Sequence, residues 1–141
     1  MNETDKLEHR NLKESDWDTL VSWWTAWPDW TAPAKEFLPG NGTNGLMIQK
    51  NGIPIVAGFT YNTSNSKVVF LGWIISNPKY KEKDRQEAIE LLITEAENKS
   101  KDLGYKYMFT IGRSKSLINI HKKLVWFADD KPSNEITKKI G

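Results

Sequence analysis

Several residue types are missing or rare in this chain of 141 residues, and each absence excludes a class of chemistry. There is no cysteine, which excludes disulfide bonds, thiolate metal sites and a cysteine nucleophile. The only histidines are His9 and His121, too few for a histidine-rich metal site. No run approaches the roughly 20 apolar residues of a membrane span, and the charged N-terminus does not resemble a signal peptide. We therefore expect a cytoplasmic protein with no metal and no membrane association.

The length fits a single domain over residues 1–141, because no linker-like segment divides the chain. The net charge of +2 is distributed unevenly. Residues 1–66 carry five Lys or Arg against eight Asp or Glu, whereas residues 67–141 carry fifteen against ten. The second half is therefore the better place for an anionic ligand. Nucleic acid is not expected as a partner, because the net charge is small and the aromatic residues lie mostly in apolar runs.

A β-α-β unit is predicted in the second half of the chain. Residues 67–76 are almost continuously apolar, which is typical of a strand buried on both faces. A basic turn over residues 77–86 leads into an amphipathic helix that ends at Gly104. Residues 105–111 then form a second strand. Such a unit places two parallel strands side by side through a right-handed crossover.

The remaining elements predict a mixed sheet. Strands at residues 46–50 and 53–62 are joined by Asn51-Gly52, the strongest short signal for a hairpin. With the strand at 67–76 they form a three-stranded antiparallel meander. We also expect a strand at 7–12, a helix from Ser15 to about Ala26, a short helix ending near Leu124, and strands at 125–128 and 135–140. The fold class is therefore α/β (α+β).

This order of elements resembles the GNAT superfamily of N-acetyltransferases over nearly the whole chain. Residues 73–89, a hydrophobic strand followed by a basic turn and a long helix, are similar to the acyl-CoA pyrophosphate loop of that family. Residues 114–127 are similar to its C-terminal motif, with Ser114 at an Asn position and His121 where a general-acid Tyr is common. The Trp-rich start and the Leu-Pro-Gly-Asn-Gly-Thr segment resemble small GNAT-like proteins of tailed phages.

The resemblance implies an acetyl-CoA site. Backbone groups around Ile74, Ile75 and Ser76 would bind the pantetheine arm. Backbone N–H groups of the turn would bind the pyrophosphate at the helix N-terminus, over Lys81, Glu82, Lys83, Asp84, Arg85 and Gln86. The resemblance also assigns Ser114, at the Asn position of the C-terminal motif, to cofactor binding.

The turn departs from the family pattern at two positions. Asp84 stands where the family has Gly, and Gln86 where it has Gly or Ala. The alternative interpretation of this turn is a capping box, with Asp84 as N-cap and Glu87 at the third helical position. However, Lys79, Lys81, Lys83 and Arg85 gather at a helix N-terminus, where cations oppose the helix dipole unless an anion binds.

Two functions remain open from the sequence. The first is direct transfer of acetyl from acetyl-CoA to a small-molecule or protein amine, with His121 as the general acid. The acceptor side would be formed by Trp23, Trp27, Trp30, Phe37 and Tyr61, although the tryptophans would serve equally as core residues. The second is a catalytically inactive GNAT-fold binding protein that presents its aromatic surface to a protein partner. Homodimer formation is left open.

Overall fold

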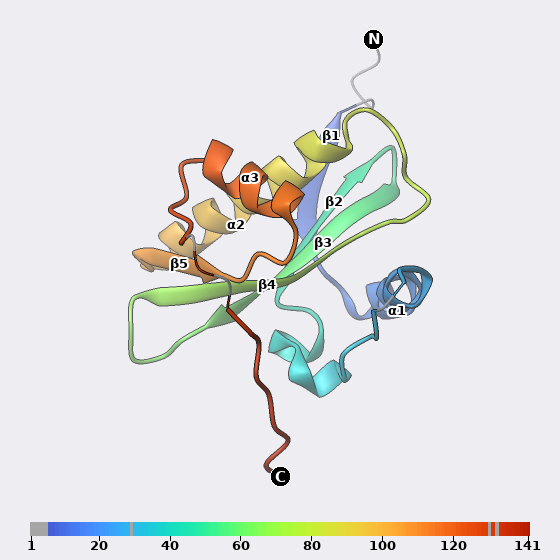
Figure 1. The fold of residues 1–141 in the computed structure, drawn as a ribbon. Coiled ribbons are helices and arrows are strands. Elements are labelled where there is room, and N and C mark those ends of the chain that lie inside the picture. The colour runs from blue at the N-terminus through green and yellow to red at the C-terminus, as the bar shows by residue number, and fades with distance from the viewer. Residues whose placement is uncertain (1–5, 29, 130, 132) are drawn as a thin grey trace.

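A computed structural model describes residues 6–28, 30–129, 131 and 133–141. It contains a five-stranded mixed sheet in the order β1-β2-β3-β4-β5 (Figure 1). The strands are β1 (Leu7–Asn11), β2 (Gly45–Lys50), β3 (Ile53–Asn62), β4 (Val68–Ser76) and β5 (Tyr107–Thr110). The first four strands are antiparallel and β5 is parallel to β4. The predicted meander and β-α-β unit are both confirmed.

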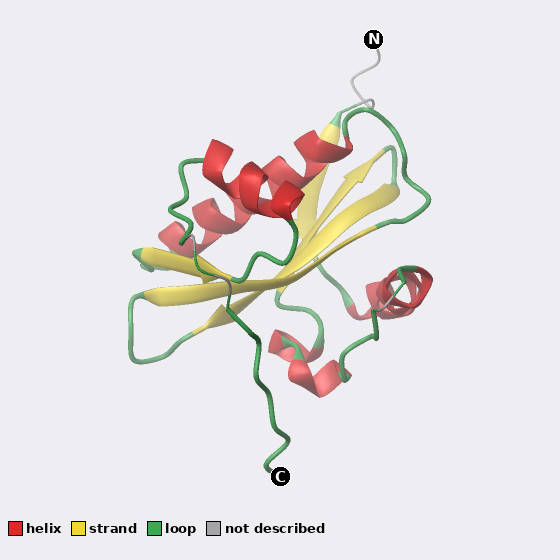
Figure 2. Ribbon diagram, in the orientation of Figure 1, coloured by secondary structure: helices red, strands yellow, loops and turns green. Residues whose placement is uncertain are grey.

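Helices cover the two faces of the sheet (Figures 1 and 2). Helices α2 (Arg85–Asp102) and α3 (Lys115–Lys123) lie on one face. Helix α1 (Trp17–Ala26) lies on the other, with short 3-10 helices at Glu14–Asp16, Lys35–Phe37 and Pro39–Asn41. None of the helices described here is long and apolar enough to cross a bilayer.

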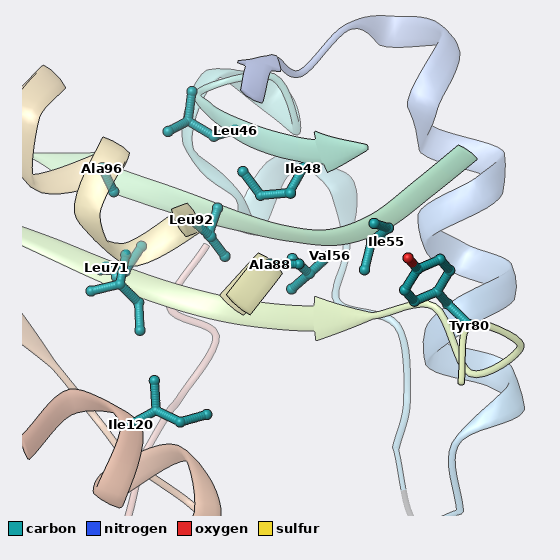
Figure 3. Packing of buried hydrophobic residues seen from close by; sticks show 11 residues of the cluster. Leu46, Ile48, Ile55, Val56, Leu71, Tyr80, Ala88, Leu92, Ala96 and Ile120 are labelled. Carbon is teal, nitrogen blue, oxygen red and sulfur yellow. The ribbon is translucent and has the colours of Figure 1, made fainter. Parts of the chain in front are cut away.

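Each face of the sheet has its own apolar core. On the α2 face, Leu92 and Ala96 of the helix pack with Ile48, Val56 and Leu71 of the sheet (Figure 3). On the α1 face, Trp24 is completely buried and its ring lies 6.3 Å from that of Phe59. The two cores hold both helix layers against β2, β3 and β4, which fixes the position of the cavity described below.

The hairpin and the end of α2 depend on left-handed backbone conformations that the sequence predicts. Asn51 and Gly52 have φ angles of 52° and 75°, which suit a two-residue hairpin turn. Gly104, with φ at 94°, follows the last residues of α2. A β-branched side chain at either glycine would be strained, because positive φ brings Cβ too close to the backbone.

The two predicted C-terminal strands are absent from the described residues. The chain after α3 is held against the helices instead. Trp126 donates from its backbone N to the His121 carbonyl of α3 at 3.0 Å and from Nε1 to Glu97 Oε1 of α2 at 2.5 Å. A strand needs a neighbouring edge as well as a suitable pattern. The prediction of strands at 125–128 and 135–140 was therefore wrong, and β5 pairs with β4 alone.

Candidate acyl-CoA and amine site

A cavity of about 700 Å³ opens where β4 and β5 separate. The parallel pairing runs only from Val68 opposite Tyr107 to Leu71 opposite Thr110. Thr110 Oγ1 donates to the Leu71 carbonyl at 2.6 Å and closes this paired region. Beyond it, β4 continues to Ser76 with no described partner on its β5 side. The freed edge of β4 forms one wall of the cavity.

The cavity is lined from both faces of the sheet. Ile74, Ile89 and Ile120 belong to the α2 side, where they are part of or pack on that core. Trp73 and Tyr61 line the cavity from the α1 side, where they pack on the other core. The cavity therefore connects the two faces through the gap between β4 and β5.

A bulge in β4 shapes the wall of the cavity. Ile75 pairs with Ala57 and Gly72 pairs with Phe59, so that Trp73 and Ile74 together face Gly58. Trp73 has a φ of 54°, an unusual value for a bulky residue. Such outliers persist only where the surroundings fix them and are common at binding sites.

The side chain of Asp84 is turned away from the helix it precedes. Asp84 is the N-cap of α2 by position but makes no capping hydrogen bond. It accepts from Tyr80 Oη at 2.6 Å and from Lys50 Nζ at 2.9 Å. Those two bonds, Tyr80 first, lower the pKa of Asp84 below its ordinary 3.8. The alternative interpretation of this turn as a capping box is therefore wrong, since the Asp84 side chain is engaged elsewhere.

The N-terminus of α2 presents free donors as a result. Within the described residues, the backbone N–H groups of Lys83, Gln86 and Glu87 donate to no protein acceptor. Lys81 and Lys83 are exposed and form no ion pair in the described part of the chain. Unpaired N–H groups at a helix start, with cations around them, form a site for an anion.

Arg85 connects this helix start to the cavity. Its Nη2 donates to Ser76 Oγ at 2.9 Å, and its guanidinium lies 5.5 Å from the centre of the Trp27 ring. Trp27 is itself fixed by a 2.9 Å hydrogen bond from Nε1 to the Ser76 carbonyl. Arg85 Nε is buried without a partner. A buried donor of this kind is costly unless a ligand satisfies it.

The predicted cofactor residues divide into three groups. Ile74, Ser76, Arg85 and Ser114 line the cavity. Ile75 points to the α1 core instead, as the alternation along a strand requires. The turn residues Lys81, Glu82, Lys83, Asp84 and Gln86 lie outside the cavity lining.

The predicted acceptor residues also divide. Trp30, Phe37 and Tyr61 line the cavity. Trp23 is a core residue, only 4% exposed, and Trp27 supports Arg85 and Ser76 rather than lining the cavity. Burial raises the pKa of Tyr61 to about 12, so its hydroxyl stays neutral and donates to the Phe37 carbonyl at 3.1 Å.

His121 is not brought into the cavity. It is 4% exposed, its Nδ1 lies 2.8 Å from the Leu117 carbonyl, and its ring contacts Trp126 edge to face at 4.8 Å. Its Nε2 is buried without a partner. His121 therefore does not line the gap between β4 and β5, and the contacts that the structure gives it are packing contacts within α3 and with Trp126.

Sequence reasoning missed several residues that line the cavity: Phe70, Trp73, Ile89, Thr110, Arg113, Ser116 and Glu135. Arg113 and Glu135 form an ion pair across 22 positions of the chain. No local pattern marks Glu135, because only the folded chain brings it to Arg113. The apolar pattern could have pointed to Trp73, which follows a glycine within a buried strand.

No model of a known protein family matches the chain, and no curated protein matches its sequence. Solved structures do match. The ribosomal-protein-S18-alanine N-acetyltransferase from Escherichia coli superposes with a TM-score of 0.68 at 14% identity, over 84% of this chain and 76% of that one. N-acetylglutamate synthase from Neisseria gonorrhoeae, complexed with coenzyme A and N-acetyl-glutamate, superposes with a TM-score of 0.67 at 9% identity, over 83% of this chain. The match spans only 28% of that synthase.

AAC(6')-Iy, in complex with the bisubstrate analogue CoA-S-monomethyl-acetylneamine, gives a TM-score of 0.62 at 14% identity, over 96% of this chain and 99% of that one. At such identities the comparisons establish the fold. The chain has the GNAT fold, with its mixed sheet and its antiparallel meander.

Proposed function

We propose that the protein is an acyl-CoA-dependent N-acetyltransferase that transfers acetyl from acetyl-CoA to an amine. The observation that carries this proposal is the cavity that crosses the sheet between β4 and β5 and begins at the start of α2. A two-substrate transfer needs two ligands to meet end to end. A cavity lined from both faces of one sheet allows each ligand to enter from its own side.

Acetyl-CoA is assigned to the α2 side. Its pantetheine arm is an extended chain with amide groups, and the freed edge of β4 from Gly72 to Ser76 offers backbone partners to such a chain. The pyrophosphate is assigned to the N–H groups at the start of α2. Asp84 does not compete for these groups, because its carboxylate is held by Tyr80 and Lys50.

Arg85 is assigned to the same ligand. Its charge, its buried unpartnered Nε and its position in the cavity lining suit an anionic group that enters at the start of α2. The cation–π contact with Trp27 and the hydrogen bond to Ser76 hold the guanidinium in place before the ligand arrives, which lowers the entropic cost of binding.

The acetyl transfer is assigned to the gap in the sheet. The neutral amine attacks the thioester carbonyl, a C–N bond forms, and the C–S bond breaks to release coenzyme A. No covalent intermediate on the protein is needed, which agrees with the absence of cysteine. Proximity of two bound substrates supplies much of the acceleration in such a reaction.

The structural neighbours support the proposal at the level of reaction class. One of those described above is named as an N-acetyltransferase and one as N-acetylglutamate synthase, and two were solved with coenzyme A or a bisubstrate analogue that contains it. The nature of the amine differs among them, so the acceptor is argued separately below.

Calorimetry with acetyl-CoA tests the proposal directly. We expect binding, and we expect Arg85→Ala to weaken it by about tenfold, or 1.4 kcal/mol. Turnover can be followed by detection of the released coenzyme A thiol, and the chain adds no background because it contains no cysteine. Absence of both heat and thermal stabilisation at millimolar acetyl-CoA would reject the enzyme and leave the binding-protein prediction.

A further inference from the structure

The part of the cavity on the α1 face is walled by aromatic rings, which we call the aromatic wall: Trp30, Phe37, Tyr61, Phe70 and Trp73. Phe37 meets Trp73 edge to face at 5.8 Å, and Tyr61 lies 5.6 Å from Phe70. Trp30 and Phe37 are 37% and 48% exposed, so these rings present apolar surface to whatever enters. A flat apolar or aromatic body would fill this space with favourable ring contacts.

One ion pair stands at the edge of the aromatic wall. Glu135 is the only carboxylate among the described residues that line the cavity, and it pairs with Arg113. The Arg113 guanidinium lies 5.5 Å from the centre of the Trp30 ring. A cation is thus already held here by one aromatic face and one carboxylate, the two partners that a ligand ammonium group prefers.

We propose that the acceptor is a primary amine carried on an aromatic body, and that Glu135 binds its ammonium group while the aromatic wall holds the ring. This inference rests on the proposed function. A carboxylate has lone pairs enough to accept from both Arg113 and the ligand. Arg113 then holds Glu135 in position for the amine.

The same features disfavour a polyhydroxylated polycation such as an aminoglycoside. Such a ligand carries several ammonium groups, and this wall offers a single carboxylate. Its hydroxyl groups would also lose water against five aromatic rings, with few polar partners in return. The shared fold therefore does not by itself imply that this protein accepts an aminoglycoside.

The reaction balances with these groups. The bound ammonium releases one proton to water near Glu135, whose side chain is 33% exposed. The neutral amine then forms the C–N bond as the C–S bond breaks. The products are the acetamide and coenzyme A as the thiol, with one proton released overall. Glu135 acts as the group that binds and orients the amine.

The test uses binding of 2-phenylethylamine to the full chain without acetyl-CoA, measured by calorimetry and by tryptophan fluorescence. We expect binding of this amine, weaker binding of the neutral analogue 2-phenylethanol, and none of the aminoglycoside neamine at the same concentration. Glu135→Gln should weaken the amine by about tenfold and leave the alcohol unchanged. Glu36→Gln, which removes an exposed carboxylate beside Phe37 that does not line the cavity, serves as the matched control.

The inference is overturned if neamine binds as tightly as 2-phenylethylamine, or if Glu135→Gln leaves the affinity for the amine unchanged. Since acetyl-CoA is not needed for this measurement, the two proposals fail separately. Amine binding without acetyl-CoA binding would reject the transferase alone. Acetyl-CoA binding without selective amine binding would reject only the proposal about the acceptor.

Discussion

The Tyr80 hydroxyl donates a 2.6 Å hydrogen bond to the carboxylate of Asp84, four residues further along the chain. The ring of Tyr80 is buried in the core on the α2 face, so this donor is fixed in position (Figure 3). Burial, and then the neighbouring Asp84, raise the pKa of Tyr80 to about 12. The hydroxyl therefore stays a donor at neutral pH and keeps the carboxylate away from the free N–H groups of α2.

We predict different effects on coenzyme A affinity when the donor or the acceptor of this hydrogen bond is substituted. Tyr80→Phe keeps the buried ring but removes one of the two hydrogen bonds that hold the Asp84 carboxylate, leaving only the bond from Lys50. The carboxylate can then approach the helix start, where it would repel the pyrophosphate, so affinity should fall. Asp84→Ala removes the negative charge, so affinity should be maintained or increase. Both variants should lose about 1 to 3 kcal/mol of unfolding free energy. Calorimetry with coenzyme A and urea unfolding measure the two effects, and a fall in affinity for both variants would contradict this mechanism.

A second prediction concerns the positioning of Arg85 by Trp27. Arg85→Lys keeps the charge but loses the planar stacking and the fork of donors, so coenzyme A affinity should fall by several-fold. Trp27→Phe should have a similar effect, because it removes the hydrogen bond to the Ser76 carbonyl. Lys122→Ala, an exposed cation of α3 outside the cavity lining, is the control that tests for a general charge effect. If Lys122→Ala lowers coenzyme A affinity as much as the other two variants do, the prediction is contradicted.

A third prediction concerns stability at acidic pH. Asp16 accepts from Arg10 at 2.8 and 2.9 Å, and these bonds lower the pKa of Asp16 below its ordinary 3.8 despite some loss of solvation. A lowered folded pKa stabilises the protein fully above about pH 4, and the contribution is lost as pH falls through the folded pKa. Urea unfolding between pH 6 and pH 2 should therefore show a smaller loss for Asp16→Asn than for the wild type. Asp18→Asn, at an exposed position of α1, should follow the wild type.

A fourth prediction separates stability from turnover at His121. His121→Ala removes a buried ring that packs on Trp126, so unfolding free energy should fall by about 2 kcal/mol or more. The kcat/KM for acetyl transfer should remain within a few-fold of the wild type, measured at a temperature where both proteins are folded. A large loss of kcat in the folded variant would instead support His121 as the general acid.

Local patterns predicted most of the sheet correctly. The Asn51-Gly52 turn, the apolar run of β4 and the glycine after α2 each depend on neighbours in sequence, so their structures follow from backbone preferences and from hydrophobic periodicity. The C-terminal strands were predicted wrongly because that prediction also used the local pattern alone. Their apolar pattern was real, yet Val125, Phe127, Ile136 and Ile140 remain about 90% or more exposed, because Trp126 is held on α2 and no edge is paired.

The sequence by itself determined the order of the elements as far as α3, the antiparallel meander, the crossover to β5 and the gathering of cations at the start of α2. Only the tertiary structure decided where β4 and β5 separate, which way the Asp84 carboxylate points and which aromatic side chains line the cavity. Register along β4 is shifted by the bulge at Trp73, and the partners of Asp84, Arg85 and Glu135 come from other elements or turns. These are contacts between distant parts of the chain, and their geometry is fixed by packing, which local preferences do not encode.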